Sequence, residues 1–91
     1  MDDFKKALDF HQQNKLNLAE KLYALVLQKN PDHADALHHF ALLLSQTGRI
    51  QDALVFFDRA QKITPNNPTL YINWGHALRA AGDFQNAIHV Y

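Results

Sequence analysis

The stretch that decides the fold is Tyr71–Tyr91, YINWGHALRAAGDFQNAIHVY. Its landmarks are a mid-stretch glycine, a leucine, a second glycine, an alanine and a final aromatic residue: Gly75, Leu78, Gly82, Ala87 and Tyr91. The residues 34 positions before these landmarks have the same physical character: Ala41, Leu44, Gly48, Ala53 and Phe57. A second step of the same length reaches Ala7, Phe10, Asn14, Ala19 and Tyr23. Small and large apolar positions therefore recur at one fixed period, which indicates a repeat architecture.

The small landmarks have a packing role that follows from helix geometry. A missing side chain in the middle of a helix lets a second helix approach closely, and larger side chains then fill the space around that contact. We predict close contacts at Ala7, Ala41 and Gly75 in the first helices and at Ala19, Ala53 and Ala87 in their partners. The predicted space-filling residues are Phe10, Tyr23, Leu44, Phe57, Leu78 and Tyr91. A plain helical bundle could carry a similar apolar stripe, but it would not require a 34-residue register.

Trp74-Gly75 with Leu78, followed by Gly82, Ala87 and an aromatic residue, resembles the signature of the tetratricopeptide repeat. The resemblance implies an all-α fold, a right-handed α-solenoid of antiparallel helix pairs. It predicts a single array over residues 1–91, with a first repeat at 1–33, a second at 34–67 and a truncated third at 68–91.

Local signals place the ends of the predicted helices. Pro31 disfavours helical geometry at Asn30, Asp32 is then expected to cap the third helix, and Asn67-Pro68 is typical of a helix start. Asn14, Gly48 and Gly82 suit the left-handed conformation that ends a helix. The helices are expected over about Asp2–Gln13, Leu16–Lys29, His33–Gln46, Ile50–Ile63 and Pro68–Ala81, with a sixth that starts near Asp83.

The composition excludes several classes of function. Nine basic and nine acidic side chains cancel, so neither nucleic acid nor a membrane is an expected partner. The chain has no cysteine, which excludes disulfides and thiolate sites. Apolar and charged residues alternate in Met1–Gln13, unlike a signal peptide, so we expect a cytoplasmic protein.

The sequence shows no phosphate-binding loop, nucleophile elbow or zinc-protease motif, and we therefore expect no enzymatic activity and no cofactor. The histidines His38, His39 and His76, with His11, are the only residues that suggest a metal. Neighbouring side chains on a helix diverge by about 100°, so His38 and His39 cannot easily share an ion. We expect histidines in contact with solvent or a partner, which would make binding sensitive to pH near neutrality.

Stacked helix pairs create a concave groove lined mainly by the first helix of each pair. We expect this groove to bind an extended or helical peptide, with apolar contacts from Phe4, Leu8, Leu42 and Ile72. The alternative is that these apolar side chains only pad the superhelix. The full set of candidate groove residues is Phe4, Lys5, Leu8, Gln12, Asp35, His38, His39, Leu42, Gln46, Thr69, Ile72, Asn73 and His76.

The resemblance also bears on the class of partner. Asn73 matches in position the asparagine that recurs along the groove in the repeat domain of O-linked N-acetylglucosamine transferase, but Lys5 and His39 occupy the equivalent places in the other repeats. Some members of the family clamp the terminal carboxylate of a heat-shock chaperone with cationic side chains. The corresponding places here lack every cation, so a chaperone C-terminal tail is not an expected partner.

Two further expectations concern the setting of the array. In bacteria such repeats resemble the leading segment of glycosyltransferases and sulfotransferases, so the alternative to a scaffold is a recognition or oligomerisation module of a larger enzyme. The N-terminal face carries Asp3 and Lys6, whereas the truncated third repeat offers apolar surface. Because repeat arrays need a polar end to remain monomeric, we expect self-association through the C-terminal end.

Overall fold

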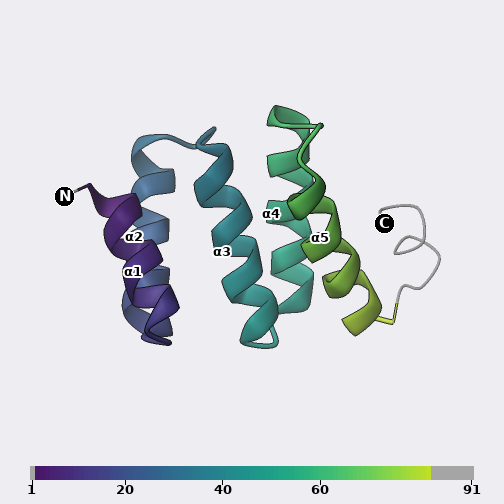
Figure 1. The fold of residues 1–91 in the computed structure, drawn as a ribbon, viewed down its shortest axis with the longest axis horizontal. Helices are drawn as coiled ribbons and strands as arrows, with labels where there is room; N and C mark the ends of the chain where they lie inside the picture. Colours follow the sequence, from purple (N-terminus) through teal and green to yellow (C-terminus); the bar gives the residue numbers. More distant parts are fainter. Residues whose placement is uncertain (1, 83–91) are drawn as a thin grey trace.

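The computed structural model describes residues 2–82, which form five α-helices and contain no strand. The helices are α1 (Asp3–Gln12), α2 (Leu16–Lys29), α3 (Ala34–Gln46), α4 (Ile50–Ile63) and α5 (Pro68–Ala80). Successive helices run in opposite directions; α2 lies behind α1 at the N-terminal end, and α3, α4 and α5 follow along the long axis (Figure 1). Within this part of the chain, no helix has the length and apolar character needed to cross a lipid bilayer.

Side chains cap three of the helix starts. The Asp2 carboxylate accepts a hydrogen bond from the Lys5 backbone N–H at 2.8 Å, and the Asn67 side-chain oxygen accepts one from the Leu70 backbone N–H at 3.2 Å. Each bond satisfies a backbone donor that has no partner within its own helix. The predicted start at Asn67-Pro68 is therefore confirmed.

The predicted cap of α3 is wrong by one residue. His33, not Asp32, is the N-cap, and its Nδ1 accepts a hydrogen bond from the Ala36 backbone N–H at 3.1 Å. The reason lies in the turn, where the Asp32 N–H donates to Asn30 Oδ1 and the His33 N–H to the Asn30 carbonyl. Because Asp32 is held inside this turn, α3 starts later than the sequence pattern suggests.

Left-handed residues end the first helix of each pair, as predicted. Asn14 has φ of 61°, and Gly48 and Gly82 each have φ of 84°. Around Asn14, the Lys15 N–H reaches back to the Phe10 carbonyl at 2.8 Å, and the same pattern joins Arg49 to Leu44 at 2.9 Å. These are the 6→1 bonds of Schellman turns, in which a left-handed residue reverses the chain within a few positions. The turns hold the two helices of a pair antiparallel.

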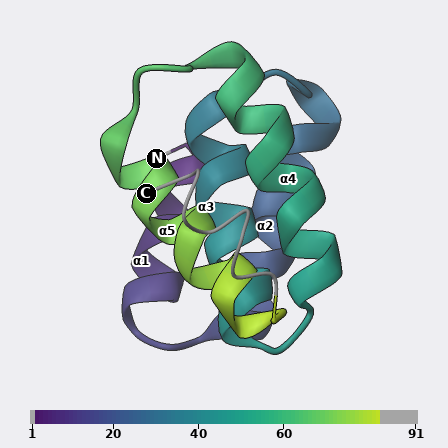
Figure 2. The ribbon, with the colours of Figure 1, turned by 90° about the vertical axis from the view of Figure 1, so that its right-hand side faces the viewer.

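The helices form two layers. Seen end on, α1, α3 and α5 lie on one side of the molecule and α2 and α4 on the other (Figure 2). Along the first layer the backbones of α1 and α3, and of α3 and α5, come close together, whereas among the described residues those of α2 and α4 do not. The first layer is thus more tightly packed along the array than the second, which curves the array toward the first helices. Residues 2–82 form an α-solenoid.

The core contains the small residues that the 34-residue period singles out. Ala7, Ala19, Ala41 and Ala53 are fully buried, as are the aromatic rings of Tyr23 and Phe57. Leu44, Gly75 and Leu78 are also buried, whereas Phe10 is half-buried beside the core of the first pair. Ala87, Tyr91 and the expected sixth helix lie outside the described residues.

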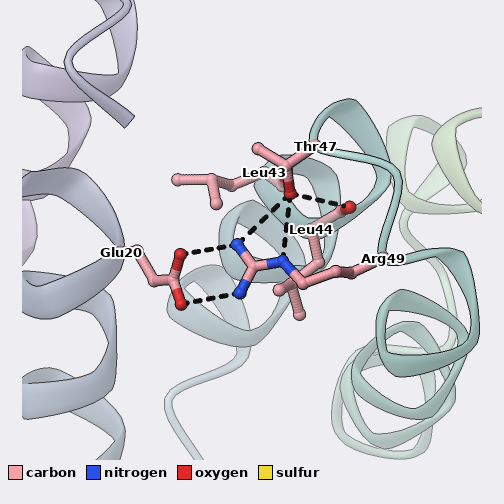
Figure 3. A network of polar contacts seen from close by, with 5 residues as sticks. All are labelled: Glu20, Leu43, Leu44, Thr47 and Arg49. Carbon is pink, nitrogen blue, oxygen red and sulfur yellow. Dashed lines mark hydrogen bonds and ion pairs between the residues drawn. The ribbon is translucent and has the colours of Figure 1, made fainter. Parts of the chain in front are cut away.

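A polar network joins the first helix pair to the second (Figure 3). Arg49 donates from Nη1 and Nη2 to the two carboxylate oxygens of Glu20 in α2, at 2.9 and 2.5 Å. Its guanidinium also donates to Thr47 Oγ1, which in turn donates to backbone carbonyls at the end of α3. The hydrogen bond from Arg49 holds the pKa of Glu20 below its usual value. Because both side chains are partly exposed, the pair orients the two hairpins more than it stabilises them.

Packing at Ala53 yields a testable prediction. Ala53→Leu adds three carbon atoms where no space is left, and we expect it to lower the free energy of unfolding by about 1–3 kcal/mol. Ala24→Leu makes the same change at an exposed position of α2 and serves as the control. Urea unfolding followed by circular dichroism measures both, and equal midpoints for the two variants would contradict the close helix contact.

Candidate functional site

The candidate groove residues lie on the first helices but differ widely in exposure. Ile72 is the most open of the apolar ones, with 50% of its surface exposed. The exposed members of the set are Lys5, Gln12, Asp35, Gln46, Thr69, Ile72 and His76. The half-buried members are Phe4, Leu8, His39, Leu42 and Asn73, and His38 is buried.

Side-chain contacts between neighbouring first helices follow a common offset of 35 residues. Phe4 packs on His39 with ring centroids 5.9 Å apart, His11 is hydrogen bonded to Gln46, and His38 is hydrogen bonded to Asn73. Each pair is separated by one repeat length plus one residue, as expected where stacked helices are slightly displaced along their axes. We call these three contacts the rungs of the groove.

His38 forms the buried rung between α3 and α5. It is only 6% exposed, stacks on His39 and contacts the Phe57 ring, so the expectation of a solvated histidine is wrong at this position. Burial lowers the pKa of His38, an effect that nearby Asp35 partly offsets. The Asn73 amide nitrogen donates to His38 Nε2 at 3.0 Å, which places the proton of the neutral ring on Nδ1.

His39 lies in an aromatic stack on the same face. Its ring stacks on the Tyr23 ring, with centroids 6.5 Å apart, and on the His38 ring, with centroids 5.3 Å apart. The Phe4 ring is tilted against it. Burial, with the neighbouring His38 and His11 rings, lowers the pKa of His39 to about 4, although Asp35 acts in the opposite direction. His38 and His39 are therefore neutral at pH 7. The sequence predicts binding that is sensitive to pH near neutrality, but these two side chains take up a proton only in acid.

His11 connects a buried hydroxyl to the groove surface. The Tyr23 hydroxyl lies 2.8 Å from His11 Nδ1, and His11 Nε2 lies 2.7 Å from Gln46 Oε1. Burial raises the pKa of Tyr23 to about 12, so the phenol keeps its proton and can donate. The three residues come from α2, α1 and α3 and form a continuous chain of hydrogen bonds.

An open cavity of about 290 Å³ lies between α1 and α3, at the Gln46 end of these hydrogen bonds. We call it the α1–α3 cavity. It combines two leucines, two imidazoles and two primary amides: Leu8, Leu42, His11, His39, Gln12 and Gln46. Five of these six belong to the candidate groove set, and no Asp, Glu, Lys or Arg side chain lines the cavity.

Two further cavities lie elsewhere on the surface. One of about 410 Å³ lies where the start of α1 meets the end of α2, beside the Lys29–Asp3 ion pair. The other, of about 400 Å³, lies along α2 beside Glu20 and Lys21. In residues 2–82 no three histidine or acidic side chains are grouped so that they could hold a metal ion.

The sequence alone did not identify His11 as a groove residue. The helical face that predicts the groove does not include His11, which the sequence suggests only as a possible metal ligand. The signal that would have found it is the offset of 35 residues to Gln46, which becomes visible only once the displacement between stacked helices is known.

A family model of the tetratricopeptide repeat matches residues 10–73. This chain belongs to the tetratricopeptide repeat family. The match and the paired helices together explain the 34-residue period of the sequence.

Solved structures place the array among known tetratricopeptide solenoids. The O-GlcNAc transferase of Thermobaculum terrenum, as the K341M mutant, matches with a TM-score of 0.93 and 26% identity, over 97% of this chain and 17% of that one. A crystal structure of MamA matches with a TM-score of 0.90 and 17% identity, over 97% of this chain and 48% of that one. For MamA AMB-1 the TM-score is 0.88 and the identity 22%, over 97% and 52%. The chain thus spans about half the length of the MamA structures.

The low pKa of His39 predicts a loss of stability in acid. Because the folded pKa is about 4 and the unfolded value 6.5, the unfolded chain takes up the proton first as the pH falls. The contribution of His39 is complete above about pH 6.5, declines from there to about pH 4, and then levels off. We expect a lower melting temperature at pH 5 than at pH 7 and a smaller difference in His39→Gln. A proton NMR titration that finds the folded His39 ring half-protonated near pH 6.5 would contradict this.

Proposed function

We propose that the chain is a non-catalytic interaction module that binds a segment of a partner protein along its first helices. The α1–α3 cavity is the observation that carries this proposal, because it is a concave site lined by both apolar and hydrogen-bonding side chains. Ligand sites in proteins combine mostly apolar lining with a few placed polar groups. The tetratricopeptide fold supports a protein partner as the class of ligand.

The exposure of the candidate residues favours binding over padding of the superhelix. Ile72 on α5 exposes half of its surface although it lies in the closely packed layer, and Leu42 is only half-buried beside the cavity. Apolar side chains that only spaced the helices would be covered by them. A partner segment that crosses from the α1–α3 cavity to α5 would cover both residues.

The double variant Leu42→Ala, Asn73→Ala tests the groove. A peptide selected on the parent protein from a displayed random library is the probe. We expect its affinity to fall by about tenfold or more, because truncating a central apolar contact typically costs more than 1 kcal/mol. Isothermal titration calorimetry measures the change, and circular dichroism shows whether the variant remains folded.

A matched control places the same two substitutions away from the groove. Leu25→Ala, Asn66→Ala changes an exposed leucine of α2 and an exposed asparagine of the α4–α5 turn. Its peptide affinity should equal that of the parent. If the control lost affinity while the groove variant kept it, the binding surface would lie on the second helices and the proposal would fail.

A recognition module of a larger enzyme is a second candidate. The match to 17% of the O-GlcNAc transferase chain favours it, since a stretch of this fold is there part of a longer enzyme chain. The size of the endogenous polypeptide, measured by antibody detection and intact mass, distinguishes the two candidates. A single species of about the mass of these 91 residues would exclude the module, and a much larger species would favour it.

A further inference from the structure

We propose that Tyr23 and His11 fix the amide of Gln46 as a hydrogen-bond donor, so that the α1–α3 cavity selects an extended peptide carrying an uncharged apolar side chain. This inference rests on the proposed function and specifies its ligand. It follows from the hydrogen-bond chain that runs from the buried interior of the first helix pair to the groove surface.

The donor and acceptor roles along these hydrogen bonds are fixed, because the first donor is a buried hydroxyl. Tyr23 is fully buried, and among the described residues His11 Nδ1 is the only partner of its hydroxyl. A buried hydroxyl proton without an acceptor would be costly, so the hydroxyl donates to Nδ1. Gln46 Oε1 can only accept, so the His11 ring carries a proton on Nε2 and donates it across 2.7 Å.

The consequence for Gln46 is a fixed amide orientation. Its carbonyl oxygen is occupied by His11, which leaves the two N–H groups of the amide as donors at the edge of the cavity. A free surface glutamine can turn either its oxygen or its nitrogen toward a ligand. Gln46 instead offers donors alone, and the matching group on an extended peptide is a backbone carbonyl oxygen.

The lining of the cavity determines which peptide side chain can accompany that carbonyl. Leu8 and Leu42 supply apolar contact, and none of the six lining residues is an Asp, Glu, Lys or Arg that could pair with a buried charge. A charged side chain placed there would lose hydration without gaining a partner. The cavity of about 290 Å³ is roughly twice the volume of about 150 Å³ that holds a benzene molecule, so it admits one aliphatic or aromatic side chain and its flanking amide.

The test begins without any ligand. Long-range nitrogen–proton NMR of the parent should show His11 protonated on Nε2 and bare on Nδ1. Tyr23→Phe removes the donor to Nδ1 with little change of shape, and we expect the proton to redistribute between the two nitrogens. A parent His11 protonated on Nδ1 and bare on Nε2 would overturn the inference, because Nε2 would then accept from Gln46 and reverse its amide.

The second arm uses acetylated and amidated Ala-Ala-Xaa-Ala-Ala peptides with Xaa as Leu, Phe, Asp or Lys. We expect the Leu and Phe peptides to shift the resonances of Leu42 and of the Gln46 side-chain amide, while the Asp and Lys peptides leave both unchanged at the same concentration. Gln46→Glu keeps the shape but removes the donors, and should weaken the Leu peptide about tenfold, equivalent to about 1.4 kcal/mol. Tyr23→Phe should weaken it about threefold, since it releases a single hydrogen bond.

Gln51→Glu is the matched control, because it makes the same exchange at an exposed position of α4. Its affinity should equal that of the parent. Equal affinity of Gln46→Glu and the parent, or equal binding of the Lys and Leu peptides, would overturn the inference. Peptides that shift Ile72 and Asn73 but not Leu42 would overturn it and leave the proposed function standing. Peptides that shift only residues of α2 and α4 would overturn the proposed function itself.

Discussion

Close approach of paired helices at alanine is the constraint on which the rest of the structure depends. Ala7, Ala19, Ala41 and Ala53 have no exposed surface, and the two buried aromatic rings fill the space beside them. Helices this close leave room for only one arrangement of the flanking side chains. The orientation of each first helix, and therefore the side chains it presents to the groove, follows from this contact.

The polar groups of the groove depend on the same core. The Tyr23 ring packs in the interior of the first helix pair, yet its hydroxyl reaches His11 and through it Gln46 on the groove surface. His38 packs against Phe57 while its Nε2 holds Asn73. In both places a buried aromatic contact positions a histidine, which positions an amide on the next helix. The two amides are thus ordered by contacts that begin in the protein interior.

Most of the fold could be predicted from the sequence because it depends on spacing. The 34-residue period located the small packing residues, and proline, asparagine and glycine located the turns, since each has strong local backbone preferences. The sequence-based predictions were wrong or incomplete where a shift of one residue along a helix changes which side chain makes a contact. The cap at His33 depended on how Asn30 closes its turn, and the rungs depended on the displacement between stacked helices. The burial of His38 could not be read from its own helix, because the groups that cover it belong to α4 and α5.

In the described part of the chain the backbones of α2 and α4 do not approach each other, so the two layers are joined along the array in different ways. Neighbouring hairpins meet through α3, which packs against every other described helix. On the outer layer, the Glu20–Arg49 ion pair and the hydrogen bond from Arg59 to the Pro31 carbonyl link the first two hairpins. The spacing of these hairpins is thus set by helix packing around α3 on the inner side and by surface side chains on the outer side.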